Sequence, residues 1–77
     1  MRTVTVIGAG GWGTALAVHL AGLGKQVRLW GRDEALISRM SDSRSNESYL
    51  PGIPFPESVH PTASLADATA GADCVVW

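Results

Sequence analysis

Short apolar runs alternate along this chain with segments whose apolar residues recur at helical spacing. The runs expected to form strands are Val4–Ile7, Val27–Trp30, Ser58–Thr62 and Asp73–Trp77. The run Val4–Ile7 is β-branched, which is typical of a strand in a buried parallel sheet, and Val27–Trp30 alternates as a strand does. Strands that alternate with helices predict an α/β fold, because parallel neighbours need a crossover segment between them.

Three helices are predicted between these strands. The first follows a glycine-rich turn, and its large apolar residues stand at positions 12, 16, 20 and 23, which is helical spacing. Gly24 supplies a stop signal after it. Each of the other two follows a side chain that can cap a helix: Asp33 before Glu34–Met40, and Ser64 before a short helix ending near Ala70.

Two segments after the second predicted helix are expected to be loops. Ser41–Glu47 is polar and is predicted to lie at the surface, with Asn46 making loop hydrogen bonds. The prolines of Tyr49–Pro56 exclude a helix and a central strand. We expect an extended, ordered loop there, with its apolar members packed on the sheet. The whole order, β-α-β-α-loop-β-α-β, predicts the N-terminal half of a Rossmann-type doubly wound parallel sheet.

The turn Gly8–Gly13 has the spacing G-x-G-x-x-G between a strand and a helix. Gly8 permits a tight turn, Gly10 has no Cβ to hold a pyrophosphate away, and Gly13 lets the helix lie close to the strand. The helix N-terminus offers unpaired N–H groups to the anion. The context favours dinucleotide binding over a purely structural turn.

Composition narrows the class of protein. The formal charge of −1 and the lack of a basic cluster argue against a nucleic-acid or anionic-membrane partner. Cys74 is the single cysteine, so no internal disulfide is expected, and no residues have the spacing of a metal site. No apolar stretch reaches the roughly 20 residues of a membrane span, and a strand begins near the N-terminus, so a cytoplasmic protein is expected.

The end of the second predicted strand bears on the type of nucleotide. An acid about 20 residues after a glycine turn binds the ribose 2′-hydroxyl of NAD, whereas an arginine suits the 2′-phosphate of NADP. Here Arg32 comes first and Asp33 follows. The hypothesis is that NADP(H) is accepted at least as well as NAD(H). The alternative is that Arg32 is a solvated surface charge and Asp33 only a helix cap.

Three motifs, in order along the chain, carry a resemblance to a known family. They are Gly8–Ala17, with a tryptophan inside the glycine turn; the aromatic-x-Arg-Asp of Trp30–Asp33; and Asn46 followed by Tyr49–Ile53. They resemble, respectively, G-x-G-S/A-x-G-T-A-L-A, the second-strand end and the N-x-x-Y-L-P-G segment of bacterial NAD(P)-dependent glycerol-3-phosphate dehydrogenase. From the first residue of the first motif to the last of the third, they span more than half of the 77 residues.

The resemblance implies an enzyme that reduces dihydroxyacetone phosphate with NAD(P)H to sn-glycerol 3-phosphate, a phospholipid precursor, and also runs in reverse. Together, the glycine turn and the resemblance predict these cofactor-binding residues: Gly8, Gly10, Gly11, Trp12, Gly13, Arg32, Asp33 and Tyr49. Gly11 replaces the family's frequent serine, which removes one possible hydrogen bond but keeps the backbone donor. Two alternatives stay open: Trp12 could cover the sheet, and Tyr49 could be a core aromatic.

No catalytic residue is predicted within the chain. Residues 1–77 are interpreted as the N-terminal part of an NAD(P)-binding domain, with a helical substrate domain beyond them. The family's catalytic lysine comes from that later part, and Lys25 lies in the turn before the second strand, at the wrong edge of the sheet. The 77 residues alone are therefore expected to be inactive, and a homodimer is considered for the full-length protein.

Two other classes of protein share the glycine turn. One is another two-domain dehydrogenase, such as a relative of ketopantoate reductase or 6-phosphogluconate dehydrogenase, but these lack the Y-L-P-G segment. The other is a non-enzymatic NAD(H)-sensing regulatory domain, which needs no substrate domain.

Overall fold

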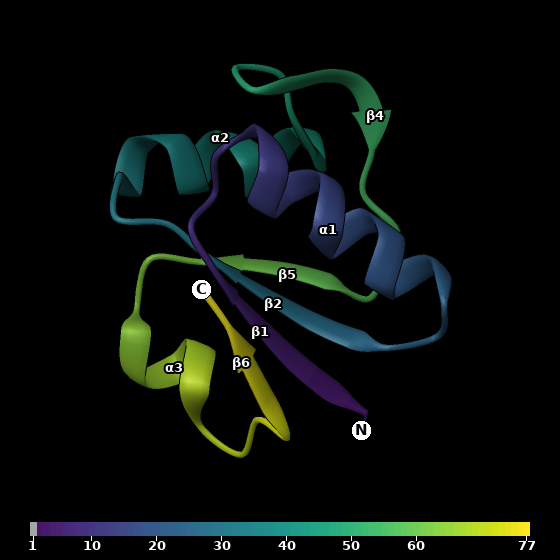
Figure 1. Ribbon diagram of the computed structural model, residues 1–77. Helices are drawn as coiled ribbons and strands as arrows, with labels where there is room; N and C mark the ends of the chain where they lie inside the picture. The colour runs from purple at the N-terminus through teal and green to yellow at the C-terminus, as the bar shows by residue number, and fades with distance from the viewer. Residues whose placement is uncertain (1) are drawn as a thin grey trace.

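The computed structural model describes residues 2–77, and its centre is a parallel sheet in the order β5-β2-β1-β6 (Figure 1). The strands are β1 (Thr3–Ile7), β2 (Gln26–Trp30), β5 (Val59–Thr62) and β6 (Cys74–Val76). The chain runs outward from β1 through β2 to β5, then returns past β1 to β6. The four predicted strands and the Rossmann-type order are thus confirmed.

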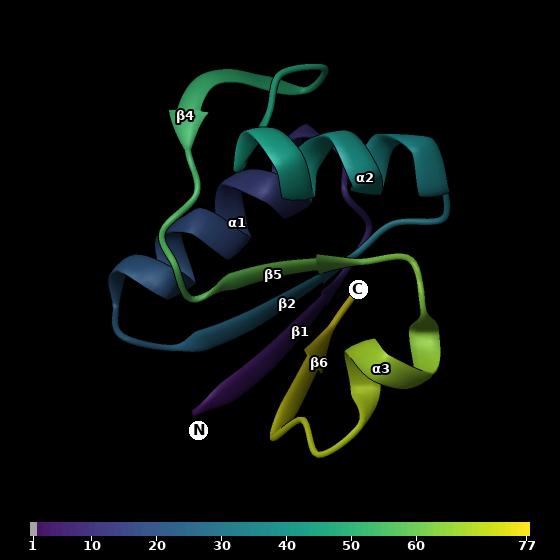
Figure 2. The ribbon, with the colours of Figure 1, turned by 180° about the vertical axis from the view of Figure 1, so that it is seen from behind.

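Helices lie on both faces of the sheet. Helices α1 (Gly11–Gly22) and α2 (Glu34–Ser43) cover one face, and the short helix α3 (Leu65–Thr69) lies on the other (Figures 1 and 2). Of the helices in residues 2–77, none is long and apolar enough to cross a membrane.

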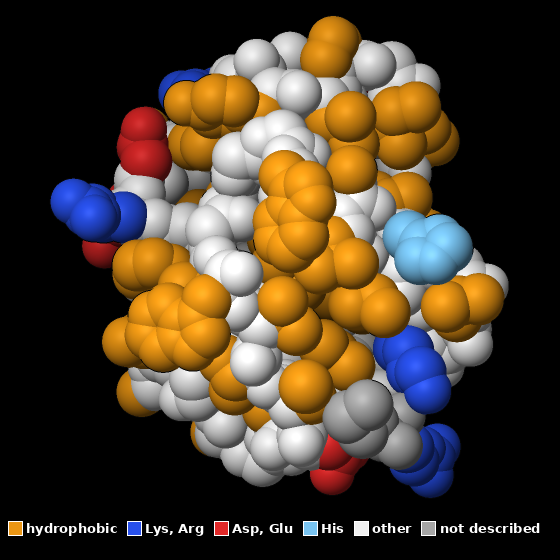
Figure 3. All heavy atoms as spheres, in the orientation of Figure 1, with side chains coloured by type: hydrophobic (Ala, Val, Ile, Leu, Met, Phe, Trp, Pro, Cys, Tyr) orange, Lys and Arg blue, Asp and Glu red, His pale blue; other side chains and the backbone are white. Residues whose placement is uncertain are grey.

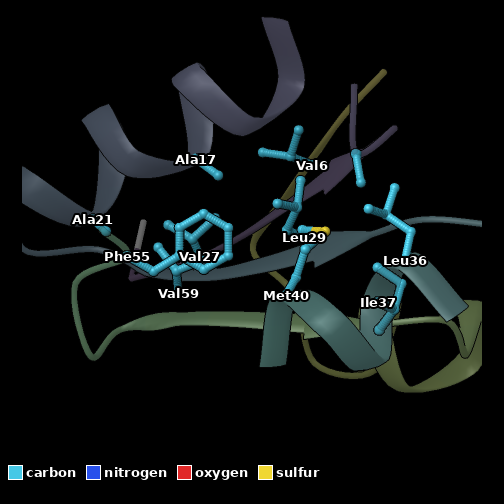
Figure 4. Packing of buried hydrophobic residues seen from close by; sticks show 11 residues of the cluster. Val6, Ala17, Ala21, Val27, Leu29, Leu36, Ile37, Met40, Phe55 and Val59 are labelled. Atoms are coloured by element: carbon cyan, nitrogen blue, oxygen red, sulfur yellow. The ribbon is translucent and has the colours of Figure 1, made fainter. Parts of the chain in front are cut away.

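The main core lies between the sheet and the two helices α1 and α2. Strand register places Val6 beside Leu29 and Val27 beside Val59, and all four side chains are fully buried. Figure 4 shows side chains of α2, including Met40, pointing toward these strand residues. The strands predicted from the sequence therefore supply the sheet's half of the core.

Helix α1 buries its small residues most fully, while Leu16, Val18 and Leu20 pack against the core but are only partly buried. Its buried positions are Gly13, Thr14, Ala17 and Ala21, and Figure 4 shows the two alanines facing the sheet. The stripe at positions 12, 16, 20 and 23 predicted a helix correctly, yet Trp12 and Leu23 are exposed. Small residues occupy the sheet side because they let the helix axis come close to the strands.

A small antiparallel hairpin replaces the two predicted loops. It consists of β3 (Ser45–Asn46) and β4 (Leu50–Pro54), and it stands beyond α1 and α2, away from the main sheet (Figures 1 and 2). The predicted surface loop 41–47 is wrong, because α2 continues to Ser43 and both residues of β3 are buried.

The expectation for Tyr49–Pro56 holds only in part. Phe55 is buried in the main core, but Ile53 is 40% exposed and the rest of β4 after Leu50 is exposed as well. Proline is tolerated here because β4 belongs to a two-stranded hairpin and not to the centre of a sheet. The hairpin is therefore anchored at Phe55 and by the buried β3, and it leaves β4 largely in solvent.

Candidate dinucleotide-binding site

The glycine turn begins where β1 ends, at the carboxyl edge of the sheet. Gly8 has a φ of +117°, a conformation that side chains disfavour, and its N–H donates to the Trp30 carbonyl oxygen at 2.9 Å. A Cβ at Gly13 would lie 1.9 Å from the carbonyl oxygen of Gly8, so only glycine fits there. The predicted structural roles of both glycines, the tight turn and the close helix approach, are confirmed.

Helix α1 presents its N-terminus to open space. Gly10 is the N-cap residue, and the first helical hydrogen bond runs from the Thr14 N–H to the Gly10 carbonyl oxygen at 3.0 Å. The N–H groups of Gly11, Trp12 and Gly13 precede that bond and are the orphan donors of the helix end. A Cβ at Gly10 would meet nothing within 4 Å, so an anion has room to approach these donors.

A hollow of about 260 Å³ lies beside the turn. Its walls come from the turns after β1 and β2 and from the hairpin: Ala9, Gly10, Gly31, Arg32, Asp33, Leu36 and Tyr49. The structure therefore brings together four of the predicted site residues: Gly10, Arg32, Asp33 and Tyr49. Gly11 adjoins them, because its Cβ would lie 3.3 Å from the Tyr49 carbonyl oxygen.

A larger hollow, of about 320 Å³, lies between α2 and the hairpin. It contains none of the predicted site residues, and its walls combine Leu36 and Met40 with six polar or charged residues: Arg39, Asp42, Ser43, Ser45, Glu47 and Ser48. The smaller hollow is the candidate site, because it alone of these two borders the helix N-terminus where an anion is favoured.

Arg32 and Asp33 take different positions at the rim of the smaller hollow. Asp33 is the N-cap residue of α2, and its Oδ1 accepts from the Leu36 N–H at 3.2 Å. The alternative interpretation of Asp33 assigns it a helix cap, and the structure shows that cap. The side chain of Arg32 is exposed and lines the hollow, where a forked guanidinium can bind phosphate.

Both predicted aromatic site residues are exposed. Trp12 is 67% exposed and Tyr49 is 57% exposed. The alternative that Trp12 covers the sheet is wrong, and so is the alternative that Tyr49 belongs to the core. Figure 3 shows apolar side chains in a broad band across the α1 side of the molecule, with charged side chains toward its margins.

The reasoning from sequence missed the importance of Asn46. Its side chain does make the expected hydrogen bonds, but it is fully buried and reaches the glycine turn. A polar residue in a polar stretch gives no sign of burial, although the N-x-x-Y-L-P-G spacing was a signal that could have pointed to it.

Comparison with known proteins bears on this geometry. The sequence profile described as "NAD-dependent glycerol-3-phosphate dehydrogenase N-terminus" matches residues 3–77. The chain belongs to this family. The match spans the glycine turn, the hollow and the hairpin, and it does not favour the ketopantoate reductase, 6-phosphogluconate dehydrogenase or sensor alternatives.

Individual relatives agree with the family assignment. Over 74 residues, 96% of this chain, it is 51% identical to the glycerol-3-phosphate dehydrogenase [NAD(P)+] of Desulfotalea psychrophila. It is 49% identical over 76 residues, 99% of the chain, to the enzyme of that name from Corynebacterium glutamicum. The crystal structure of glycerol-3-phosphate dehydrogenase from Coxiella burnetii superposes on 96% of the chain with a TM-score of 0.93 and 36% identity.

The chain is much shorter than these relatives. It spans 22% of the Desulfotalea protein, 23% of the Corynebacterium protein and 23% of the Coxiella chain. The similarity therefore concerns the N-terminal, Rossmann-type portion of the family.

Proposed function

We propose that this chain is the cofactor-binding part of an enzyme that interconverts sn-glycerol 3-phosphate and dihydroxyacetone phosphate with NAD(P)(H). The observation that carries the proposal is the hollow at the carboxyl edge of the sheet, where the helix N-terminus meets Arg32, Asp33 and Tyr49. In a chain of this family, that arrangement suits an adenine dinucleotide, since the phosphates and the adenosine have adjoining places.

The residues fit such a cofactor at each of its parts. The N–H groups at the start of α1 bind the pyrophosphate, and Gly10 leaves the approach clear. Arg32, Asp33 and Tyr49 surround the adenosine end, while the exposed ring of Trp12 is a contact farther along the turn. Gly8 and Gly13 act indirectly, by holding the turn and the helix in place.

Arg32 favours NADP(H) over NAD(H) in this proposal. One oxygen of Asp33 is engaged in capping α2, which leaves that carboxylate less able to bind a ribose 2′-hydroxyl. The exposed guanidinium of Arg32 lies in the same hollow and offers paired donors to a 2′-phosphate.

The residues of this chain would bind and orient the cofactor, whose nicotinamide would carry the hydride when bound. A developing alkoxide needs a proton donor or an electrostatic partner. Lys25, the single lysine in the sequence, precedes β2 and so lies at the amino edge of the sheet, opposite the turn. We therefore assign the proton donor to a part of the protein beyond these residues, and the 77 residues alone to binding without turnover.

Titration of the full-length protein with NADPH and NADH, followed by a turnover assay with dihydroxyacetone phosphate, tests the proposal. We expect both cofactors to bind and Arg32→Ala to raise the Kd for NADPH roughly tenfold, with a smaller effect on NADH. Arg39→Ala, which removes an exposed arginine outside the hollow, is the matched control. Unchanged NADPH affinity in Arg32→Ala removes Arg32 from the site, and binding without turnover favours a sensor.

The proposal extends to the setting of the enzyme. We place it in the cytoplasm, as a homodimer that supplies glycerol 3-phosphate for phospholipid synthesis, with no nucleic-acid or membrane partner. Light scattering of the full-length protein measures the oligomeric state, and cell fractionation measures the location.

A further inference from the structure

The hairpin is bonded to the glycine turn by one buried side chain. Asn46 in β3 is fully buried, and its Nδ2 donates to the Ala9 carbonyl oxygen at 2.9 Å and to Thr14 Oγ1 at 2.8 Å. These two acceptors lie on opposite sides of the turn, one between the first two glycines and one in the first turn of α1. The same amide group therefore joins both arms of the turn.

The acceptor atom of Asn46 points the other way, into the hairpin. Its Oδ1 accepts from the Tyr49 N–H at 3.3 Å. Tyr49 lines the hollow, and its carbonyl oxygen is 3.3 Å from the position a Gly11 Cβ would take, so the hairpin rests directly on the turn. The amide thus links the anion-binding end of the site to its adenosine end.

We propose that Asn46 is a positioning residue for dinucleotide binding, a role that rests on the proposed function. It fixes the glycine turn and the Tyr49 wall in one arrangement and does so from beneath the site. Its bond to the Ala9 carbonyl keeps that oxygen turned into the protein. A carbonyl that could turn outward would present its oxygen to the phosphates. Because Asn46 holds the Ala9 carbonyl inward, the N–H groups at the start of α1 are the groups that face the ligand.

Only an amide of this length satisfies all three partners. Two of them are acceptors in their bonds to Asn46, and the third is a donor, which matches the two N–H donors and the carbonyl oxygen of an asparagine side chain. Aspartate has the same shape but, when ionised, places a carboxylate oxygen against the Ala9 carbonyl. A buried site of this kind is sensitive to such a change, because a lost donor leaves its acceptor without a partner.

The test compares substitutions at both ends of the contact in the full-length protein. Asn46→Asp is expected to raise the Kd and the KM for the dinucleotide roughly tenfold or more while kcat at saturating cofactor changes little. Thr14→Val, which keeps the shape but removes one acceptor, is expected to weaken binding less, and Thr14→Ser is expected to bind as the wild type does. If Asn46→Asp folds poorly, the difference in cofactor Kd between Thr14→Val and Thr14→Ser still tests the contact.

Arg44→Met is the control for a loosened hairpin. The Arg44 guanidinium donates to the carbonyl oxygens of Pro56 and Val59, each at 2.8 Å, and so ties the base of the hairpin to the segment that leads into β5, outside the glycine turn. We expect Arg44→Met to lower stability and leave the cofactor Kd within about twofold of the wild type.

Three outcomes distinguish a failure of the positioning role of Asn46 from a failure of the proposed function. If Asn46→Asp and Thr14→Val bind the dinucleotide as tightly as the wild type does, the positioning role of Asn46 is overturned and the proposed function is not. An Arg44→Met variant that weakens cofactor binding as much as Asn46→Asp does has the same consequence. A wild type that binds neither NADPH nor NADH overturns the proposed function, and the positioning role with it.

Discussion

At the scale of single residues, Gly13 has the least freedom in the site. It sits on the buried side of α1, and its missing side chain is what allows the helix to touch the turn that leaves β1. The neighbouring atom is a backbone oxygen, which cannot move aside as the tip of a flexible side chain can. The identity of this residue therefore affects both the fold and the position of the helix end that faces the anion.

Gly13→Ala is expected to destabilise the protein by about 1–3 kcal/mol or more, because the added methyl would lie 1.9 Å from the Gly8 carbonyl oxygen and must push α1 away from the sheet. Gly22→Ala, in the same helix, meets nothing within 4 Å and is expected to be neutral or to stabilise by at most about 1 kcal/mol. Urea unfolding of both variants checks the difference. Equal midpoints for the two would contradict the close approach at Gly13.

At the scale of elements, α3 depends on bonds from the sheet. It has five residues, which is too short for a helix to be stable alone. Arg28 of β2 donates to the carbonyl oxygens of Asp67, Ala68 and Ala70, and Thr5 of β1 also donates to Ala68. The end of the helix, where carbonyl groups lack helical partners, is thus tied to two strands.

Arg28→Met is expected to loosen α3 and to lower the free energy of unfolding by about 1–2 kcal/mol, since it removes charge-assisted bonds in a partly exposed place. The amide hydrogens of Ala68 and Ala70, which close the helix, should then exchange faster, whereas those of α1 should not change. Hydrogen exchange followed by mass spectrometry or NMR measures this. Arg39→Met removes an exposed arginine from α2 and is the control; the same loss of protection in both variants would show that charge alone matters.

The elements also show which parts of the structure the sequence could predict. Strands β1, β2, β5 and β6 and the caps of α2 and α3 follow local patterns, since β-branched runs and capping side chains act within a few residues. The hairpin does not, because Ser45 and Asn46 are polar yet buried, and the two acceptors of the Asn46 amide, Ala9 and Thr14, are 37 and 32 residues away in the sequence. For the same reason local patterns indicate the site's glycines and Arg32, and the family resemblance adds Tyr49, but no local pattern indicates the contact through which Asn46 joins the turn to Tyr49.

At the scale of the whole molecule, the candidate binding site and the Asp73 hydrogen bonds lie at opposite edges of the main sheet. The hollow lies at the carboxyl ends of the strands, whereas Asp73 lies at their amino ends. Its Oδ2 accepts from the N–H groups of Arg2 and Thr3, both at 3.0 Å, and so joins the start of β6 to the start of β1. Small domains bury little surface, so a bond between segments about 70 residues apart matters to their stability.

Asp73 should give the protein a measurable acid sensitivity. Hydrogen bonds from Thr3 and Arg2 hold the pKa of the Asp73 carboxyl below its usual value of 3.8. A carboxyl with a lowered pKa in the folded state stabilises the fold fully above pH 3.8, and this contribution disappears as the pH falls through the lowered pKa. Asp73→Asn cannot carry the charge, so it should be less stable than the wild type at pH 7, and the difference in unfolding free energy should shrink as the pH is lowered below about 4.

Urea unfolding of both proteins from pH 7 to pH 2 measures this gap in unfolding free energy directly, and the comparison cancels the other carboxyl groups that titrate in the same range. A gap that stays constant across this pH range would mean that the Asp73 charge makes no contribution to holding the two strands together.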